Sequence, residues 1–289
     1  MLAFIIPVKH PSSCRSYDVV SALLKQTLHS VCRQTSDDFR VIVVCNRKPR
    51  YSDVFKNTSF VEVDFPPPQS PVSKSEEHSH VFLDKGCKQA IGLVVARQYN
   101  PKHIMFTDAD DFVSCRIAEF TKMRPAEPGW FFEKGLVFSN LSKVIEERHR
   151  FWSYCGTSHI LRHDLIKIPA SLSVSQTKQE LINSIGLDYL TRILGDHNRY
   201  QHLCNSQGET LKPLPFNGAI WRADTGENSS RVVWGQRRFG PIWGQTITPE
   251  ISKEFGIDPQ NRSTRETLIT VLWRVRHLTA KTVKTLIRN

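Results

Sequence analysis

The sequence predicts an α/β fold in which a mixed, mainly parallel β-sheet is flanked by helices. Short buried runs alternate with a helical pattern of apolar residues over residues 2–115. One of these runs, residues 104–106, leads directly into three carboxylates, Asp108, Asp110 and Asp111. A length of 289 residues with 39% hydrophobic residues suits one large globular domain that carries a C-terminal extension.

The first part of the chain gives the clearest periodicity. Continuous apolar runs predict buried strands, and apolar residues at helical spacing predict amphipathic helices. We expect strands over residues 2–8, 39–45, 60–65 and 104–106, and helices over residues 18–33 and 84–99. Residues 66–80, which begin with Pro66-Pro67-Pro68, predict a loop. Strands that alternate with helices in this way favour a parallel sheet.

The pattern after residue 111 is less regular. A short helix is predicted over residues 112–124, strands over 129–132 and 136–139, a helical or extended segment over 187–194, and a strand entering a polar loop over 213–230. Residues 232–249 form an arm rich in Gly, Trp and Arg. The last predicted element is a basic amphipathic helix over 263–287, which Ser263 and Glu266 begin as a capping box.

The three carboxylates after the run at residues 104–106 form the main candidate site. A buried strand does not tolerate unpaired charge, so these side chains should lie where the strand leaves the sheet. In extended chain Asp108 and Asp110 point the same way, and two carboxylates so placed attract a cation. Oxygen ligands favour Mg²⁺ or Mn²⁺ over zinc. A solvated turn or a helix N-cap is the alternative interpretation of the same residues.

Polar residues also follow two other predicted strands. Lys9 and His10 come after the first strand, and Asn46 comes after the second. In open α/β sheets ligands bind in the crevice at the carboxyl ends of the strands. We therefore expect these residues and the carboxylates to line one crevice.

The composition narrows the partners and the compartment. A formal net charge of +11 suits an anionic partner. Seven scattered cysteines without a C-x-x-C pair favour a reducing compartment over a disulfide framework. No secretory signal or membrane-length apolar run is found, so we expect a cytoplasmic protein. The helix over 263–287 either packs on the main domain or lies on the inner face of an anionic membrane, as a peripheral contact through 263–289.

Residues 2–115 resemble the GT-A fold glycosyltransferases, and among them the inverting family 2. The resemblance is carried by Ile5-Ile6-Pro7-Val8, Cys32-Arg33-Gln34-Thr35, residues 39–46, Asp84-Lys85-Gly86 and Phe106-Thr107-Asp108-Ala109-Asp110-Asp111. It implies a nucleotide-sugar donor and Mn²⁺ or Mg²⁺. It also implies a catalytic domain over 1–230, with a nucleotide-binding half (1–115) and an acceptor half (116–230), followed by the arm and basic helix of 231–289.

The resemblance also implies roles for single residues on the donor side. Residues of the nucleobase pocket would be Pro7, Val8, His10 and Asn46. Lys85 would meet the base or the phosphates. Asp108 would lie near the ribose and the metal, with Ala109 beside it, and Asp110 would be the main metal ligand.

On the acceptor side, Asp196 in Leu194-Gly195-Asp196-His197 would be the catalytic base, in a motif that departs from the family's commoner Glu-Asp pair. Candidate contacts of the acceptor or the diphosphate, from the residues themselves, are Asp111, Thr157, Ser158, His159 and Arg222. The alternatives are that Asp111 holds the loop, that residues 156–159 are a plain turn and that Arg222 lies in a solvated loop.

The predicted function is therefore metal-dependent transfer of a sugar, from a UDP-sugar first of all, to a hydroxyl of a glycan or lipid-linked acceptor with inversion. One alternative is a sugar-nucleotide nucleotidyltransferase, which needs a glycine-rich loop after its first strand, and Lys9–Ser13 contains no glycine. The other is a basic nucleic-acid-binding protein. Clustered carboxylates repel phosphate in the absence of a metal, so no nucleic-acid partner is expected.

Overall fold

The computed structural model describes residues 1–68, 74–141, 143–227 and 244–257. The predicted helix over 263–287 and most of the arm over 232–249 lie outside the described residues, so the proposed boundary at residue 230 is not tested. Helices in the described part are α1 (Tyr17–Val31), α2 (Lys74–Ala96), α3 (Ile117–Lys122), α4 (Lys178–Ile185), α5 (Tyr200–Asn205) and α6 (Pro249–Phe255).

The larger sheet has seven strands within the described residues, in the order β10-β6-β9-β4-β1-β2-β3. Their bounds are β1 (Leu2–Pro7), β2 (Phe39–Cys45), β3 (Thr58–Glu62), β4 (His103–Phe106), β6 (Gly129–Phe131), β9 (His159–Arg162) and β10 (Lys212–Pro213). Strands β1 to β4 are parallel to one another, whereas β9 runs antiparallel to β4 and β6. The predicted mixed, mainly parallel sheet flanked by helices is confirmed.

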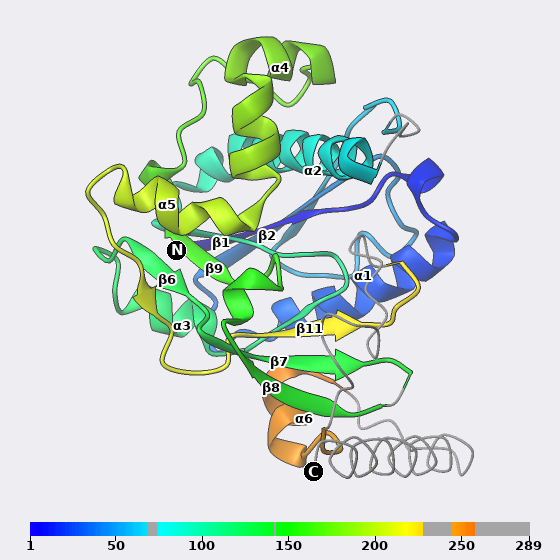
Figure 1. Cartoon of the computed structure of the whole chain (residues 1–289), viewed down its shortest axis with the longest axis vertical. Helices are drawn as coiled ribbons and strands as arrows, with labels where there is room; N and C mark the ends of the chain where they lie inside the picture. The colour runs from blue at the N-terminus through cyan, green and yellow to red at the C-terminus, as the bar shows by residue number, and fades with distance from the viewer. Residues whose placement is uncertain (69–73, 142, 228–243, 258–289) are drawn as a thin grey trace, which may run out of the picture.

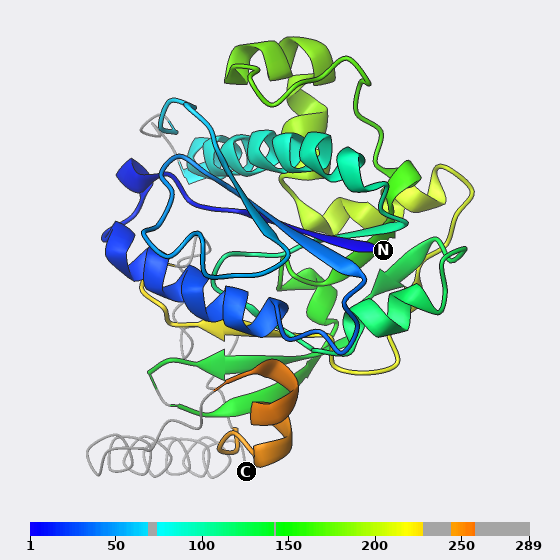
Figure 2. The same cartoon turned by 180° about the vertical axis from the view of Figure 1, so that it is seen from behind.

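Strand β1 lies inside this sheet, between β4 and β2, and is buried along its whole length. Successive side chains of a strand point to opposite faces. Leu2, Phe4 and Ile6 accordingly belong to the hydrophobic core that includes residues of α1, whereas Ala3 and Ile5 belong to the core that includes residues of α2. Figure 1 shows α2 and α1 on opposite sides of the strands, and Figure 2 shows the same arrangement from behind.

A second sheet of four strands, counted over the described ranges, has the order β5-β11-β7-β8. Its strands are β5 (Phe112–Val113), β7 (Lys134–Ser139), β8 (Ile145–His149) and β11 (Ala219–Ala223). Helix α6 packs on this sheet through Phe255, in a core with Phe112, Phe138 and Ile220. Residues 112–113 thus connect the carboxylate motif to the second sheet.

Several predicted elements differ from the structure. The loop predicted over residues 66–80 is wrong in its second half, because α2 begins at Lys74. The proline run that precedes this end obscured the start of the helix in the sequence. The helix predicted over 112–124 is instead β5 followed by α3. The strand expected at 60–65 ends three residues earlier, at Glu62.

Candidate active site

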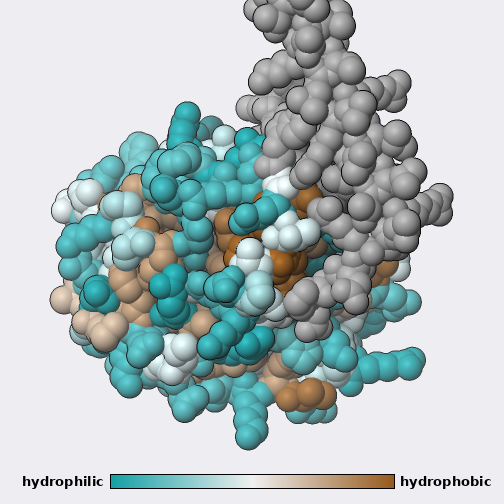
Figure 3. Space-filling model, turned by 90° about the horizontal axis from the view of Figure 1, so that it is seen from below, coloured by the Kyte–Doolittle hydropathy of each residue, from teal (hydrophilic) through white to brown (hydrophobic). Residues whose placement is uncertain are grey.

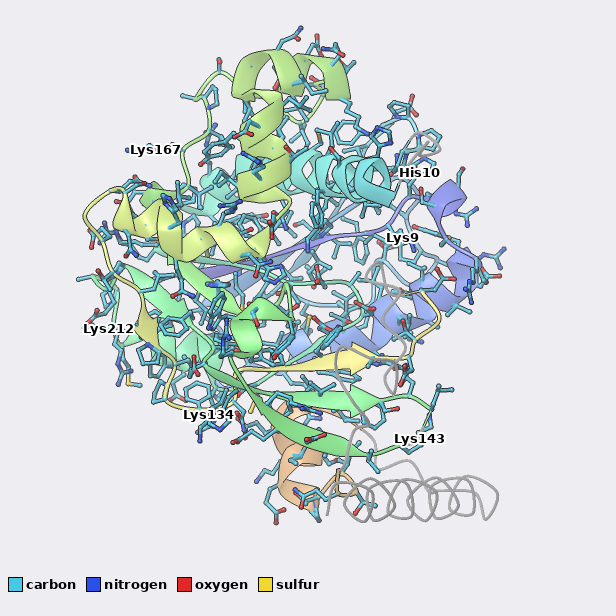
Figure 4. The ribbon with its side chains drawn as sticks, viewed as in Figure 1. Lys9, His10, Lys134, Lys143, Lys167 and Lys212 are labelled. Carbon is cyan, nitrogen blue, oxygen red and sulfur yellow. The ribbon has the colours of Figure 1, made fainter. Side chains whose placement is uncertain are left out.

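The carboxylate motif lies between the two sheets, after the end of β4. Strand β1 is flanked by β2 on one side and β4 on the other, so the strand order reverses there. Such a reversal creates a crevice at the carboxyl ends of the strands, where ligands of open α/β folds bind. The amide of Thr107 still donates to Ile5 O at 3.0 Å, and from Asp108 onward the chain leaves the ladder. Figure 4 labels Lys9 and His10 beyond the end of β1, at this same edge of the sheet.

Asp108 is held from two sides. Its carboxylate Oδ1 accepts from Lys85 Nζ of α2 at 2.5 Å, and its backbone N–H donates to Thr157 Oγ1 at 2.8 Å. Burial alone would raise the pKa of Asp108, but the charge and hydrogen bond of Lys85 outweigh burial and lower it. Asp108 is therefore an anion at neutral pH.

Asp110 has the opposite electrostatic environment. Burial, followed by the nearby charge of Asp108, raises the pKa of Asp110 to about 6, and Arg222 opposes this rise. The ionised form of Asp110 thus lacks full compensation by the protein's own charges. A cation that bridges Asp108 and Asp110 would supply that compensation.

Asp111 is fully buried and connects three segments. Its Oδ2 accepts from Thr157 Oγ1 at 2.6 Å and from Cys155 Sγ at 3.2 Å, and its Oδ1 accepts from the Arg222 backbone N–H at 3.1 Å. Burial raises the pKa of Asp111 well above its ordinary value, and the charges of its neighbours add to this. These contacts fix the motif against the loop before β9 and against β11.

The loop before β9, the first residue of β9 and strand β11 contribute four of the predicted contacts. Thr157 and Ser158 are 0% exposed, His159 is 2% exposed and Arg222, on β11, is 5% exposed. The guanidinium of Arg222 lies 4.7 Å from the ring centroid of Phe112 and donates to Asn140 Oδ1 at 3.3 Å. None of these side chains faces open solvent, and Thr157 Oγ1 donates to the carboxylate of Asp111.

Gly156 gives this loop its close approach to the carboxylates. A Cβ atom at Gly156 would lie 2.4 Å from Asp108 Oδ2 and 2.8 Å from Lys85 Nζ, closer than real Cβ contacts allow. Both atoms end flexible side chains, so they can move apart without unfolding the protein. The glycine is thus required by the ion pair and not by its own backbone angles.

We therefore expect Gly156→Ala to leave the melting temperature within about 2 °C of wild type, because the side-chain ends that must move are flexible. Binding of a nucleotide at Asp108 should weaken by about tenfold or more. Thermal melts and nucleotide titrations of the same samples measure both. The control is Ser206→Ala, at the C-terminal end of α5. Another glycine, Gly208, is unsuitable as a control because its φ of +78° would strain an alanine.

The end of β2 contributes an unusual amide. Asn46 Nδ2 donates to Val63 O at 3.1 Å and to Phe65 O at 2.9 Å, which fixes the chain after β3. Asn46 Oδ1 is buried and has no hydrogen-bond partner among the described residues. A buried acceptor without a partner is costly, and a bound N–H group would satisfy it.

A buried ion pair within α2, which was not predicted from the sequence, binds the backbone at the end of β1. Lys88 Nζ donates to Val8 O at 2.8 Å and to Asp84 Oδ2 at 2.7 Å, and Lys88 is 0% exposed. Their i,i+4 spacing on α2 was the available signal. The backbone after Pro7 and Val8 is thereby fixed, and His10 Nδ1 accepts the Ser12 N–H at 3.0 Å in the turn that follows.

Asp196 begins the short helix at His197–Arg199, where its side chain accepts the Asn198 N–H at 3.1 Å. The neighbouring His197 lies close enough to Lys85 and Asp108 for their charges to act on it. Burial, then Lys85, lowers the pKa of His197 to about 4, so the imidazole is neutral at pH 7. The structure thus brings the 196–197 segment to the same region as the carboxylates.

The donor set fits a divalent cation only in part. No group of three or more His, Cys, Asp or Glu side chains arranged for a metal is present in the described ranges. Asp108 and Asp110, however, form a pair of carboxylates, and burial followed by the charge of Asp108 raises the pKa of Asp110. Mg²⁺ in proteins commonly binds through one or two carboxylates plus substrate phosphates. The pair fits a cation that binds together with a phosphate-bearing ligand.

Comparisons with known proteins give a distant likeness. No family model matches the chain, and no curated protein matches it. Among solved structures, it is similar to S. aureus TarS 1-349, with 12% identity over 76% of this chain and 60% of that one, and a TM-score of 0.37. The same fragment in complex with UDP-GlcNAc is 12% identical over 80% of this chain and 61% of that one, with a TM-score of 0.38. S. aureus TarS is 11% identical over 77% of this chain and 36% of that one, with a TM-score of 0.37. The chain thus covers less than two thirds of each.

Three further observations concern the rest of the described residues. No helix in the described part of the chain is long and apolar enough to cross a membrane. The face seen in Figure 3 is largely hydrophilic, with hydrophobic residues between the polar ones. A separate cavity of about 330 Å³ is lined by residues that include Phe39 and Asn57, at the amino end of β2 and so at the opposite edge of the sheet from Asp108.

Proposed function

We propose that this protein is a glycosyltransferase that uses a nucleotide-sugar donor. One observation carries the proposal: Asp108 and Asp110 follow β4 at the point of the sheet where the strand order reverses, with the charges of Lys85 and Arg222 acting on them. Cationic side chains and a metal held by carboxylates both stabilise the negative charge of a nucleoside diphosphate. A site for a neutral ligand needs neither of them.

The donor in this proposal is a UDP-sugar, held by its base near the ends of β1 and β2. The Asn46 Oδ1 acceptor suits a base N–H, such as that of uracil. Asp108 and Asp110 would hold Mn²⁺ or Mg²⁺, which supplies charge stabilisation to the departing diphosphate. Lys85 would lie beside the same phosphates.

For the acceptor we propose a hydroxyl of a glycan or a lipid-linked sugar, with Asp196 as the base. A carboxylate that removes the hydroxyl proton from the face opposite the leaving group gives direct displacement, and so inversion. A peripheral membrane contact through 263–289 would suit a lipid-linked acceptor. That contact stays a prediction, because these residues lie outside the described ranges.

A thermal-shift panel of UDP, GDP, CMP and UDP-sugars, each with Mn²⁺ or with EDTA, tests the donor class. A ligand that binds only the native state raises the free energy of unfolding, by about 2.7 kcal/mol at a ligand concentration of 100 times Kd, and so raises the melting temperature. We expect UDP and a UDP-sugar to stabilise the protein with Mn²⁺ and much less with EDTA. If no nucleotide shifts the melt with either addition, the proposal fails.

The base has a separate test. Asp196→Asn should keep UDP binding within about twofold of wild type, because the substitution is nearly isosteric, yet lower the transfer rate by about 10²–10⁴-fold. Asp188→Asn, whose side chain is 78% exposed, is the matched control. Single-turnover transfer and UDP titration separate the two effects. Transfer at the wild-type rate by the Asp196 variant would assign the base to another residue.

A further inference from the structure

The ion pair between Lys85 and Asp108 has a consequence for the order in which ligands bind. The ammonium and the carboxylate lie 2.5 Å apart, and their side chains are only 21% and 32% exposed. A charge-assisted hydrogen bond in such a setting is among the stronger polar contacts of a protein. Asp108, one of the two proposed metal ligands, therefore already has a cation of its own.

The second carboxylate is also near a resident cation. Arg222 lowers the pKa of Asp110, against burial and Asp108, which raise it. Asp108 and Asp110 thus each have a resident cation acting on them, Lys85 and Arg222, although Arg222 compensates Asp110 only in part. A divalent ion that enters alone must compete with Lys85 for Asp108 and with the charge of Arg222. A diphosphate that enters alone meets the two carboxylates. Each ligand on its own is therefore opposed.

We propose that Lys85 is an internal counter-ion that a divalent cation must displace from Asp108, so that the cation and the nucleoside diphosphate bind together and not singly. This inference rests on the proposed function. The diphosphate offers Lys85 a new partner, and the cation offers Asp108 one. The exchange is favourable only when both ligands are present, which is a coupling free energy between two ligands of one site. By linkage the coupling is reciprocal.

The geometry of the loop before β9 favours an exchange over a fixed pair. Lys85 reaches Asp108 from α2, and Gly156 adds no side chain that would restrict either partner. By contrast, Lys88, further along α2, is 0% exposed and also donates to Val8 O. Lys88 is thus a fixed structural cation, whereas Lys85 is partly exposed and able to change partner.

The test is a pair of titrations on the full chain. Electron paramagnetic resonance of free Mn²⁺ gives the affinity for Mn²⁺ alone, and calorimetry in EDTA gives the affinity for UDP alone. For Lys85→Met we expect Mn²⁺ alone to bind about tenfold tighter than to wild type, because Asp108 is released. UDP alone should bind about tenfold weaker, because a phosphate partner is lost. A role that is only structural would weaken both.

One control variant and one conservative variant of Lys85 complete the test. Lys212 lies on β10 and pairs with Glu127 at 2.8 Å. Lys212→Met should leave the affinity for Mn²⁺ alone and the affinity for UDP alone at wild-type values. Lys85→Arg keeps the charge and should keep Mn²⁺ binding weak without UDP; it also serves if the methionine variant does not fold. If Lys85→Met binds Mn²⁺ alone no tighter than wild type, the counter-ion inference is wrong while the proposed function stands. If wild type binds no Mn²⁺ even with UDP, both fail.

Discussion

Asp110→Asn is expected to lower kcat/KM for sugar transfer by about 10³-fold or more while the protein stays folded. The protein's own charges do not fully compensate Asp110, since burial and Asp108 raise its pKa to about 6. An amide cannot replace a charged oxygen ligand for a divalent ion. Loss of one electrostatic group at a developing charge commonly costs 10²–10³-fold, and here the metal would be lost as well.

The same substitution should stabilise the protein when no metal is present. The pKa of Asp110 is about 6 in the folded state and about 3.9 in an unfolded chain, so the folded state binds the proton more tightly. This group therefore lowers the free energy of unfolding as the pH rises from about 4 to about 6, and an uncharged amide at this position would remove that loss. In EDTA the variant should match wild type near pH 4 and exceed it by roughly 2–3 kcal/mol above pH 6.

Denaturant melts of both proteins in EDTA across this pH range measure the difference, and Asp188→Asn controls for the loss of an exposed carboxylate. A variant that is both less stable above pH 6 and inactive would indicate that Asp110 holds the loop together. Full transfer activity in the variant would remove Asp110 from the metal site.

The fold was predictable where burial alone decides the structure. The run over residues 39–45 is a strand with these bounds, because a continuous run of mostly apolar, buried side chains fits the middle of a covered sheet. The position of Asp108–Asp111 after β4 followed from the cost of burying charge. Those two arguments need no knowledge of distant residues.

The partners of the carboxylates could not be predicted in the same way. Lys85 and Asp108 are separated by most of a helix and a strand, and only the packing of α2 on the sheet brings them together. Cys155 was not singled out from the sequence, and Thr157 was expected to contact the acceptor or the diphosphate, yet both are buried against Asp111. The antiparallel β9 between β4 and β6 was also missed, because its four residues, His159–Arg162, begin in a polar run.

Asp111→Ala is expected to cause the largest loss of stability, about 3–5 kcal/mol in the free energy of unfolding. The carboxylate accepts from three donors, Thr157 Oγ1, Cys155 Sγ and the Arg222 N–H, and it is 0% exposed. Its removal leaves these donors buried without a partner, at about 1–3 kcal/mol each before relaxation. Urea denaturation measures the loss, and Asp188→Ala should cost less than about 1 kcal/mol.

Asp111→Asn separates the structural role of Asp111 from its effect on the site. The amide keeps the volume and one acceptor, so the loss of stability should be about 1–2 kcal/mol. Thr157 Oγ1 both donates to Asp111 and accepts the Asp108 N–H at 2.8 Å, so an –NH₂ group facing that hydroxyl must turn it and release Asp108. UDP binding with Mn²⁺ should then weaken about tenfold in a protein that is still folded. Unchanged binding would show that Thr157 holds Asp108 without help from Asp111.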